Sequence, residues 1–117
     1  MNHHGSCHCG KISFDVDVEG EIGEVMSCNC SLCSRRGGLL MFVPADKFTL
    51  HTPRDAIGTY TFHKHLLQHH FCPTCGIAPF SEGQDGEGNA MAAINVRCVE
   101  GVEPDQLTIK HYDGRSR

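Results

Sequence analysis

Seven of the eight cysteines stand in three short clusters, so metal binding is the chemistry that this sequence is best equipped for. The clusters are Cys7-x-Cys9, Cys28-x-Cys30-x-x-Cys33 and Cys72-x-x-Cys75, while Cys98 stands apart. Cysteines one or two residues apart let a single tight turn present two sulfurs to one tetrahedral ion, as zinc requires. Disulfide frameworks do not need such close neighbours. The spacing therefore predicts thiolate-bound zinc in place of disulfides.

The clustered cysteines do not fill two closed sites of four, so the spacing predicts two sites of different kinds. One set would be closed and structural: Cys7, Cys9, Cys72 and Cys75. The other would keep one position open, as catalytic zinc sites do: Cys28, Cys30 and Cys33. In the alternative division, Cys98 or a histidine closes the second site and makes it inert. A cysteine in an apolar run such as residues 94–99 is more often a small buried hydrophobe.

Glycine and proline around two of the clusters favour metal binding. Gly10 follows Cys9 and Gly76 follows Cys75, and glycine allows the positive φ that turns backbone N–H groups toward sulfur. Pro73 fixes the first turn residue of the third cluster and has no N–H to misplace.

The segments that must position these cysteines are short and favour β-structure. Residues 11–18 alternate between apolar and polar, which predicts a half-buried strand. Further strands are expected at residues 24–27, 39–43, 57–62, 66–71, 90–96 and 107–112, and short helical turns at 33–36, 44–47 and 104–106. The polar, glycine-rich residues 82–89 are the best candidate for a mobile loop. The pattern predicts a mainly β fold, a compact antiparallel zinc-stabilised domain.

Length and composition place further limits on the function. The 117 residues predict one domain over 1–117, and with 39% apolar residues and no Trp its core gains from bound metal. A net charge of −4 argues against a nucleic-acid partner. The longest apolar run, residues 39–43, is too short to cross a membrane, and residues 1–5 hold no apolar signal stretch. We expect a soluble, cytoplasmic protein.

The nine histidines are not expected to be the main metal ligands. His3 and His4 are expected in a frayed N-terminus, and His8 could cover the first cluster. Four more precede the third cluster and are expected on the surface or satisfied by hydrogen bonds: His63, His65, His69 and His70.

Arg35 and Arg36 follow the second cluster and are candidate substrate-binding residues. Three thiolates on one Zn²⁺ leave a net negative complex, which repels anionic substrates unless a nearby cation offsets it. Arginine also offers a fork for a substrate carboxylate. The alternative is a solvated basic pair with no ligand.

The three cysteine motifs in this order resemble the glutathione-dependent formaldehyde-activating enzyme (GFA) family, which includes centromere protein V. The matching segments are Gly5-Ser6-Cys7-His8-Cys9-Gly10, Cys28-Asn29-Cys30-Ser31-Leu32-Cys33 and Phe71-Cys72-Pro73-Thr74-Cys75-Gly76. The resemblance implies a compact antiparallel β fold of the GFA type with two zinc ions, one structural and one exchangeable. It implies the first on Cys7, Cys9, Cys72 and Cys75, and the second on Cys28, Cys30 and Cys33.

The founding activity of that family is the addition of glutathione to formaldehyde, classed as a carbon–sulfur lyase. The resemblance thus implies a zinc-dependent enzyme that joins a glutathione-like thiol to a small aldehyde at the second zinc. A non-catalytic, zinc-stabilised protein-binding module is the alternative, and the second cysteine cluster discriminates against it because a one-zinc scaffold does not need that cluster. Dithiol redox chemistry at Cys30-x-x-Cys33 lacks the βαβ context that usually surrounds it.

Overall fold

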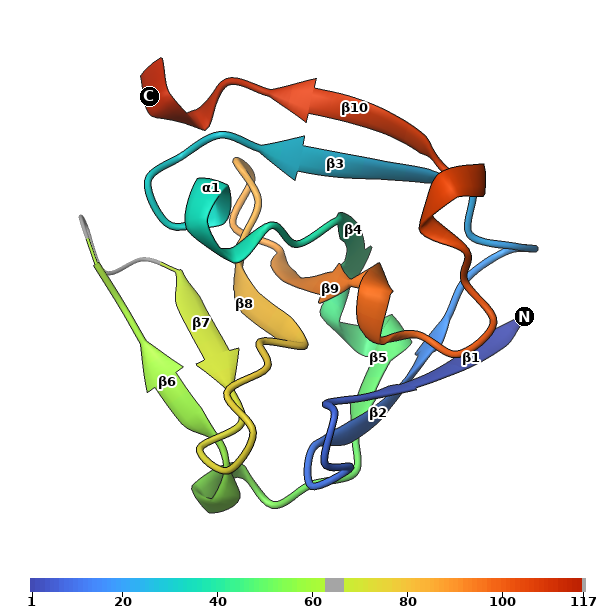
Figure 1. Ribbon diagram of the computed structural model, residues 1–117, viewed down its shortest axis with the longest axis vertical. Coiled ribbons are helices and arrows are strands. Elements are labelled where there is room, and N and C mark those ends of the chain that lie inside the picture. Colours follow the sequence, from blue (N-terminus) through green and yellow to red (C-terminus); the bar gives the residue numbers. More distant parts are fainter. Residues whose placement is uncertain (63–66, 117) are drawn as a thin grey trace.

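The computed structural model describes residues 1–62 and 67–116, which form ten strands in two sheets (Figure 1). The three-stranded sheet has the order β1 (Asn2–Ser6), β2 (Ser13–Asp17), β5 (Phe48–Leu50). The seven-stranded sheet has the order β10 (Thr108–Tyr112), β3 (Glu24–Cys28), β4 (Leu40–Pro44), β9 (Ala90–Asn95), β8 (Phe80–Gln84), β7 (Gln68–Phe71), β6 (Gly58–Tyr60). Helical segments are short: α1 (Cys33–Arg36), η1 (Ala45–Lys47), η2 (Arg54–Ala56), η3 (Val96–Cys98), η4 (Pro104–Gln106) and η5 (Gly114–Ser116).

The mainly β prediction is confirmed. Each of the seven predicted strands overlaps an observed one, and the three predicted helical turns correspond to α1, η1 and η4. The first residue of the strand predicted at 66–71 lies outside the described residues. Among the residues that are described, no helix has the length and apolar character needed to cross a membrane.

One pairing departs from the antiparallel prediction. β10 lies parallel to β3, with Thr108 opposite Glu24 and Tyr112 opposite Cys28. The chain reaches β10 through a long connection over residues 96–107, and such a crossover can return a strand in the same direction as its neighbour. As a result, β10 ends beside Cys28.

The core lies between the two sheets and is built around three phenylalanines. Phe14 on β2 and Phe80 on β8 are fully buried, and Phe48 on β5 packs between them with ring-centre distances of 5.4 and 4.7 Å. Phe14 and Val16 point inward from β2 while Asp15 and Asp17 alternate outward, so the predicted alternation holds. These ring contacts join the three-stranded sheet to the seven-stranded sheet.

The prediction that His3 and His4 lie in a frayed terminus is wrong. Residues 2–6 form β1, which pairs along its whole length with β2. Gly5 permits this pairing because a Cβ at that position would lie 2.4 Å from the Phe14 ring. The absence of a side chain lets β1 cross directly over the core, although its sequence has no apolar alternation to reveal a strand.

The prediction of a mobile loop at residues 82–89 is also corrected. Residues 82–84 complete β8. The turn that follows is held by the Asp85 carboxylate, which accepts the backbone N–H groups of Glu87 and Asn89, each at 2.9 Å. This Asx-type arrangement replaces the missing apolar contacts with local hydrogen bonds.

Candidate metal centres and the cavity between them

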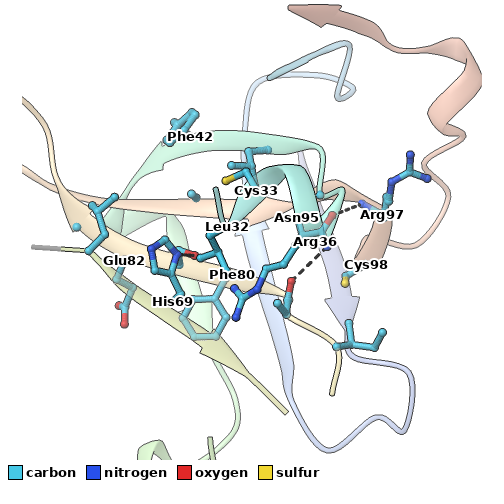
Figure 2. A pocket seen from close by; sticks show the side chains of 18 of the residues that line it. Leu32, Cys33, Arg36, Phe42, His69, Phe80, Glu82, Asn95, Arg97 and Cys98 are labelled. Carbon is cyan, nitrogen blue, oxygen red and sulfur yellow. Dashed lines mark hydrogen bonds between the residues drawn. The ribbon is translucent and has the colours of Figure 1, made fainter. Parts of the chain in front are cut away.

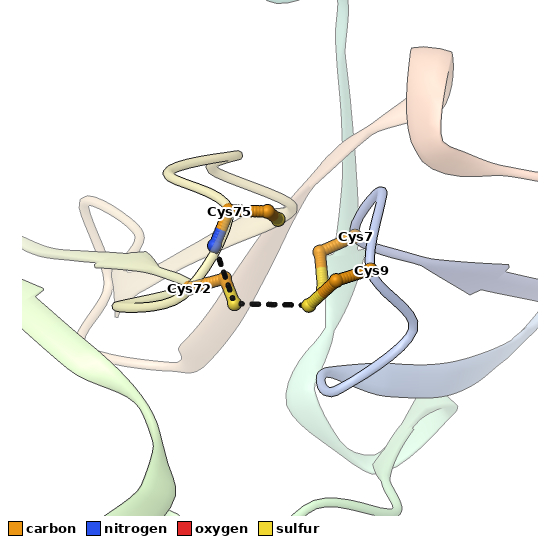
Figure 3. Close-up of side chains that lie close together, drawn as sticks. All are labelled: Cys7, Cys9, Cys72 and Cys75. Atoms are coloured by element: carbon orange, nitrogen blue, oxygen red, sulfur yellow. Dashed lines mark hydrogen bonds between the residues drawn. The ribbon is translucent and has the colours of Figure 1, made fainter.

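Four sulfurs from two distant segments converge between the sheets (Figure 3). The four-cysteine cluster consists of Cys7, Cys9, Cys72 and Cys75, whose sulfurs all lie within 4.8 Å of one another. Cys7 and Cys9 come from the turn between β1 and β2, and the other two from the turn that follows β7. Cys7 and Cys72 are buried, Cys75 is half-buried and Cys9 is exposed, so the cluster lies at the edge of the core.

The spacing of the cluster fits a tetrahedral thiolate-bound ion. Zn–S bonds near 2.3 Å place the sulfurs of such a site about 3.8 Å apart. Cys9 Sγ lies 3.7 Å from Cys7 Sγ and 3.6 Å from Cys72 Sγ. Backbone N–H groups also point at the sulfurs: Ile12 N–H donates to Cys7 Sγ, and Thr74 and Cys75 N–H groups donate to Cys72 Sγ. Such donors stabilise thiolates, the form that binds metal.

The electrostatics of the cluster call for a cation. Hydrogen bonding by the Cys9 backbone lowers the pKa of Cys75 to about 6. The Cys9 thiol shows the opposite shift: a backbone hydrogen bond from Lys11 opposes it, but burial and the neighbouring thiols raise its pKa to about 11. Adjacent sulfurs cannot all ionise without a positive charge among them, so the residues present fit a bound cation such as Zn²⁺.

The three-cysteine loop, formed by Cys28, Cys30 and Cys33, joins the end of β3 to α1. Its three sulfurs also lie within 4.8 Å of one another. The chain folds back on itself here: Cys30 N–H donates to Cys28 Sγ, and Cys33 N–H donates to Cys30 Sγ at 3.3 Å. This loop brings three sulfurs close enough to bind one ion.

In the three-cysteine loop, too, neighbouring thiols have pKa values shifted in opposite directions. Burial opposes ionisation of Cys30, but hydrogen bonds from the Cys33 backbone and from neighbouring thiols outweigh burial and lower its pKa. Burial, together with Cys30, raises the pKa of Cys33 to about 12. The residues present therefore fit a thiolate-bound ion here as well.

The segment after β10 covers the three-cysteine loop, an arrangement that the sequence did not predict. Asn29 is the link: its Nδ2 donates to Asp113 Oδ1 at 3.0 Å, and its Oδ1 accepts the Arg115 backbone N–H at 2.9 Å. Gly114 lies between these contacts, against Cys28. The position of Asn29 between two cysteines was the only available signal.

A cavity of about 910 Å³ opens beside the three-cysteine loop (Figure 2). Cys30 and Cys33 line one side, and His8 and Gly76, which neighbour the four-cysteine cluster, line the other. The cavity therefore lies between the two candidate metal centres, and its volume is in the range of small-molecule sites.

The structure separates the two arginines of the predicted substrate-binding pair. Arg36 lines the cavity, and no ion pair of Arg36 occurs within the described part of the chain. The Arg35 guanidinium turns away and donates to the Ser31 carbonyl at 2.7 Å. Arg97 also lines the cavity.

Cys98 lies on the side of the four-cysteine cluster. It packs against the core that contains Cys7, and burial together with Cys7 and Cys75 raises its pKa to about 11. It is not part of the group of sulfurs formed by the three-cysteine loop. Its position disfavours the division in which Cys98 closes the second site.

His69 and His70 are buried and hydrogen bonded, as predicted for satisfied histidines. His69 lines the cavity with Nδ1 3.1 Å from Ser81 Oγ. His70 Nδ1 lies 3.0 Å from Thr59 Oγ1, and His70 Nε2 lies 2.7 Å from Glu82 Oε1. His63 and His65 lie outside the described residues.

A third group of possible ligands, on the outer face of the three-stranded sheet, consists of His4, Asp15 and His51. His4 Nδ1 lies 2.8 Å from Asp15 Oδ1, and His51 Nε2 lies 3.2 Å from Asp15 Oδ2. The hydrogen bond from His4 lowers the pKa of Asp15 most, with smaller contributions from Asn2 and His51. These contacts account for the group as a hydrogen-bonded surface triad.

Comparison with known proteins shows the fold and the family of the chain. The chain superposes on a crystal structure of a Rhodobacter sphaeroides protein with a TM-score of 0.77 and 26% sequence identity, covering 92% of this chain and 99% of that one. The family of the glutathione-dependent formaldehyde-activating enzyme matches residues 2–111. That span contains both cysteine centres and the cavity between them. The chain belongs to the glutathione-dependent formaldehyde-activating enzyme family.

Proposed function

We propose that the protein is a zinc-dependent enzyme of the carbon–sulfur lyase class that adds a thiol such as glutathione to an aldehyde such as formaldehyde. The observation that carries the proposal is the placement of Cys30, Cys33 and Arg36 on the wall of one cavity. Membership of the family supports the choice of the two reactants.

The chain has ligands for two zinc ions with different roles. The four-cysteine cluster closes a tetrahedral site and joins residues 7–9 to residues 72–75, as a structural ion does. Among the described residues no fourth sulfur joins the three-cysteine loop, so an ion there would be more easily exchanged. Zinc in the loop would lower the pKa of a substrate thiol and hold it at the cavity.

The cavity residues would bind the two reactants and orient them for the addition. The sulfur of the thiol bonds to the aldehyde carbon, and the thiol proton passes to the oxygen, so the reaction needs no oxidant or reductant. Arg36 lines the cavity and would bind a carboxylate of the thiol, and its charge would offset that of the three thiolates. Confining both reactants in one cavity supplies much of the rate.

The test is two-dimensional exchange NMR on glutathione and formaldehyde with substoichiometric zinc-loaded protein. We expect faster exchange between free thiol and hemithioacetal than in buffer containing the same total zinc. Cys30→Ser protein is the matched control because it keeps the four-cysteine cluster. Exchange no faster than the spontaneous reaction would refute the enzymatic proposal.

One observation favours a second candidate, a zinc-stabilised protein-binding module. Three large apolar side chains on the cavity are exposed: Phe42 at 49%, Leu67 at 50% and Ile77 at 38%. Such a patch suits a protein partner as well as a small molecule. The exchange experiment separates the two functions because a binding module would not change the exchange rate.

A further inference from the structure

We infer that the aldehyde substrate carries a large apolar substituent, aromatic or long-chain aliphatic, bound in a trough beside the three-cysteine loop. This inference rests on the proposed function and names the class of aldehyde that the cavity favours. The argument comes from the register of the sheet, the walls of the cavity and the placement of its charges.

The floor of the trough is a row of side chains across four strands of the seven-stranded sheet. Phe42 on β4 lies opposite Ala93 on β9, Ala93 lies opposite Ser81 on β8, and Ser81 lies opposite His69 on β7. All four line the cavity. The two middle residues are small and the two outer ones are large, so the row forms a depression with an aromatic side chain at each end (Figure 2).

The adjacent rows add further side chains to the same face of the sheet. Leu40 lies opposite Asn95, and Gly83 lies opposite Met91, and these residues also line the cavity. Most of the remaining wall is apolar: Leu32 from the three-cysteine loop, Phe62, Leu67, Ile77 and Ala78. The exposed Phe42, Leu67 and Ile77 noted above all belong to this wall, and clustered exposed apolar side chains mark binding sites.

The charges of the cavity are too few to make it a polar site. Glu82 is paired with two side chains: Arg54 Nη2 lies 3.0 Å from Glu82 Oε2, and His70 Nε2 lies near Glu82 Oε1. The Asp85 carboxylate accepts the backbone N–H groups of Glu87 and Asn89 in the turn that it begins. Of the cations that line the cavity, Arg36 and Arg97 form no ion pair with the described residues. Arg36 and Arg97 suffice to bind the carboxylates of an anionic thiol. The trough itself therefore favours an apolar group.

Formaldehyde has no substituent on its carbonyl carbon that could fill this trough. A cavity of about 910 Å³ lies near the upper end of the range for small-molecule sites. Burying each additional methylene in such a site is expected to raise kcat/KM by about fourfold. Substrate preference should therefore rise along a series of aldehydes until the trough is full.

The experiment compares formaldehyde, propanal, hexanal and benzaldehyde with glutathione and zinc-loaded protein, each rate divided by its spontaneous rate. We expect kcat/KM to rise from formaldehyde to hexanal by more than tenfold. Ala93→Phe fills the middle of the trough and should lower the ratio of hexanal to formaldehyde activity by at least tenfold. Phe42→Ala, at an exposed position where folding is little affected, should lower the same ratio by removing one wall.

Ala90→Phe is the matched control, because Ala90 lies on the same strand, is exposed and is not part of the cavity lining. Its ratio should equal that of the unmodified protein. If formaldehyde is converted and larger aldehydes are no better, the inference is wrong while the proposed function stands. If no aldehyde is converted, the proposed function fails and the inference fails with it.

Discussion

Gly114 lies so close to Cys28 that a Cβ at position 114 would be 2.6 Å from Cys28 Sγ. The same Cβ would lie 3.1 Å from the Cβ of Cys30. The backbone of the segment after β10 therefore rests directly on the three-cysteine loop. A side chain at position 114 has no space unless the loop or the segment moves.

Gly114→Ala should therefore weaken metal binding by the three-cysteine loop without unfolding the protein. The added methyl group displaces Cys28 Sγ from its two partner sulfurs, so we expect loss of the second zinc to a chelator at least tenfold faster. The measurement is zinc release followed with a colorimetric chelator. Gly23→Ala is the control, because a Cβ there has no neighbour within 4 Å. Equal release rates in the two variants would show that the contact does not matter.

Cys75→Ser and Cys30→Ser should affect the protein very differently. A structural Zn²⁺ contributes about 10–16 kcal/mol of apparent binding energy, comparable to the whole stability of a domain. Cys75→Ser removes a ligand that joins residues 7–9 to residues 72–75, and we expect a largely unfolded or insoluble chain. Cys30→Ser affects a loop of six residues, and we expect a folded protein that binds one zinc fewer.

Melting temperature and zinc content per chain measure this difference. The unmodified protein should bind up to two equivalents of zinc, one of them resistant to mild chelation. If Cys30→Ser unfolds the protein as severely as Cys75→Ser, the second site is structural and the enzymatic proposal loses its main support.

Arg36→Ala should impair binding of a carboxylate-bearing thiol, whereas Arg35→Ala should not. Arg36 lines the cavity, while Arg35 donates to the Ser31 carbonyl. Losing a charge-assisted hydrogen bond costs about 1.5–3 kcal/mol, so the KM for glutathione should rise about tenfold or more. 2-Mercaptoethanol, which has no carboxylate, should show little change. Equal effects of the two substitutions on KM would argue against a specific role for Arg36.

Glu82 should stabilise the fold at neutral pH and lose this effect in acid. Arg54 lowers the pKa of Glu82 below its ordinary value of 4.5, and His70 adds to the shift while burial opposes it. A carboxylate with a lowered pKa stabilises the folded state above its unfolded-state pKa, and this contribution is lost as the pH falls through the folded-state value. Glu82→Gln should therefore lower the melting temperature at pH 7 and have a smaller effect below pH 4.

Calorimetry over this pH range, with Glu87→Gln as an exposed control, measures the difference. Comparing variants at each pH cancels the effect of acid on the cysteine centres. A difference in melting temperature that stays constant from pH 7 to pH 3 would mean that Glu82 acts through packing and not through its charge.

The sequence predicted the parts of the site that depend on local spacing. The cysteine turns are short motifs, and Cys30 and Cys33 belong to one loop whatever the rest of the chain does. The strand over residues 13–17 was also predictable, since Phe14 and Val16 alternate with aspartates. These features depend on neighbours a few residues away.

The features that were missed depend on distant partners. β1 and β8 are polar and contain glycine, so only their pairing with β2 and with β7 and β9 makes them strands. The direction of β10 depends on the path of residues 96–107. The trough depends on the register that aligns Ala93 with Ser81, and a shift of one strand by one residue would place these two side chains on opposite faces of the sheet.

The cover on the three-cysteine loop also implies an order of assembly during folding. Asn29 and Asp113 are 84 residues apart in the chain, whereas the loop's three sulfurs come from six consecutive residues. Contacts between residues so distant form late because closing a long loop costs conformational entropy. We expect the loop to gather its sulfurs early and β10 to dock last, so a newly folding chain would present an uncovered centre to metal before its last strand closes over it.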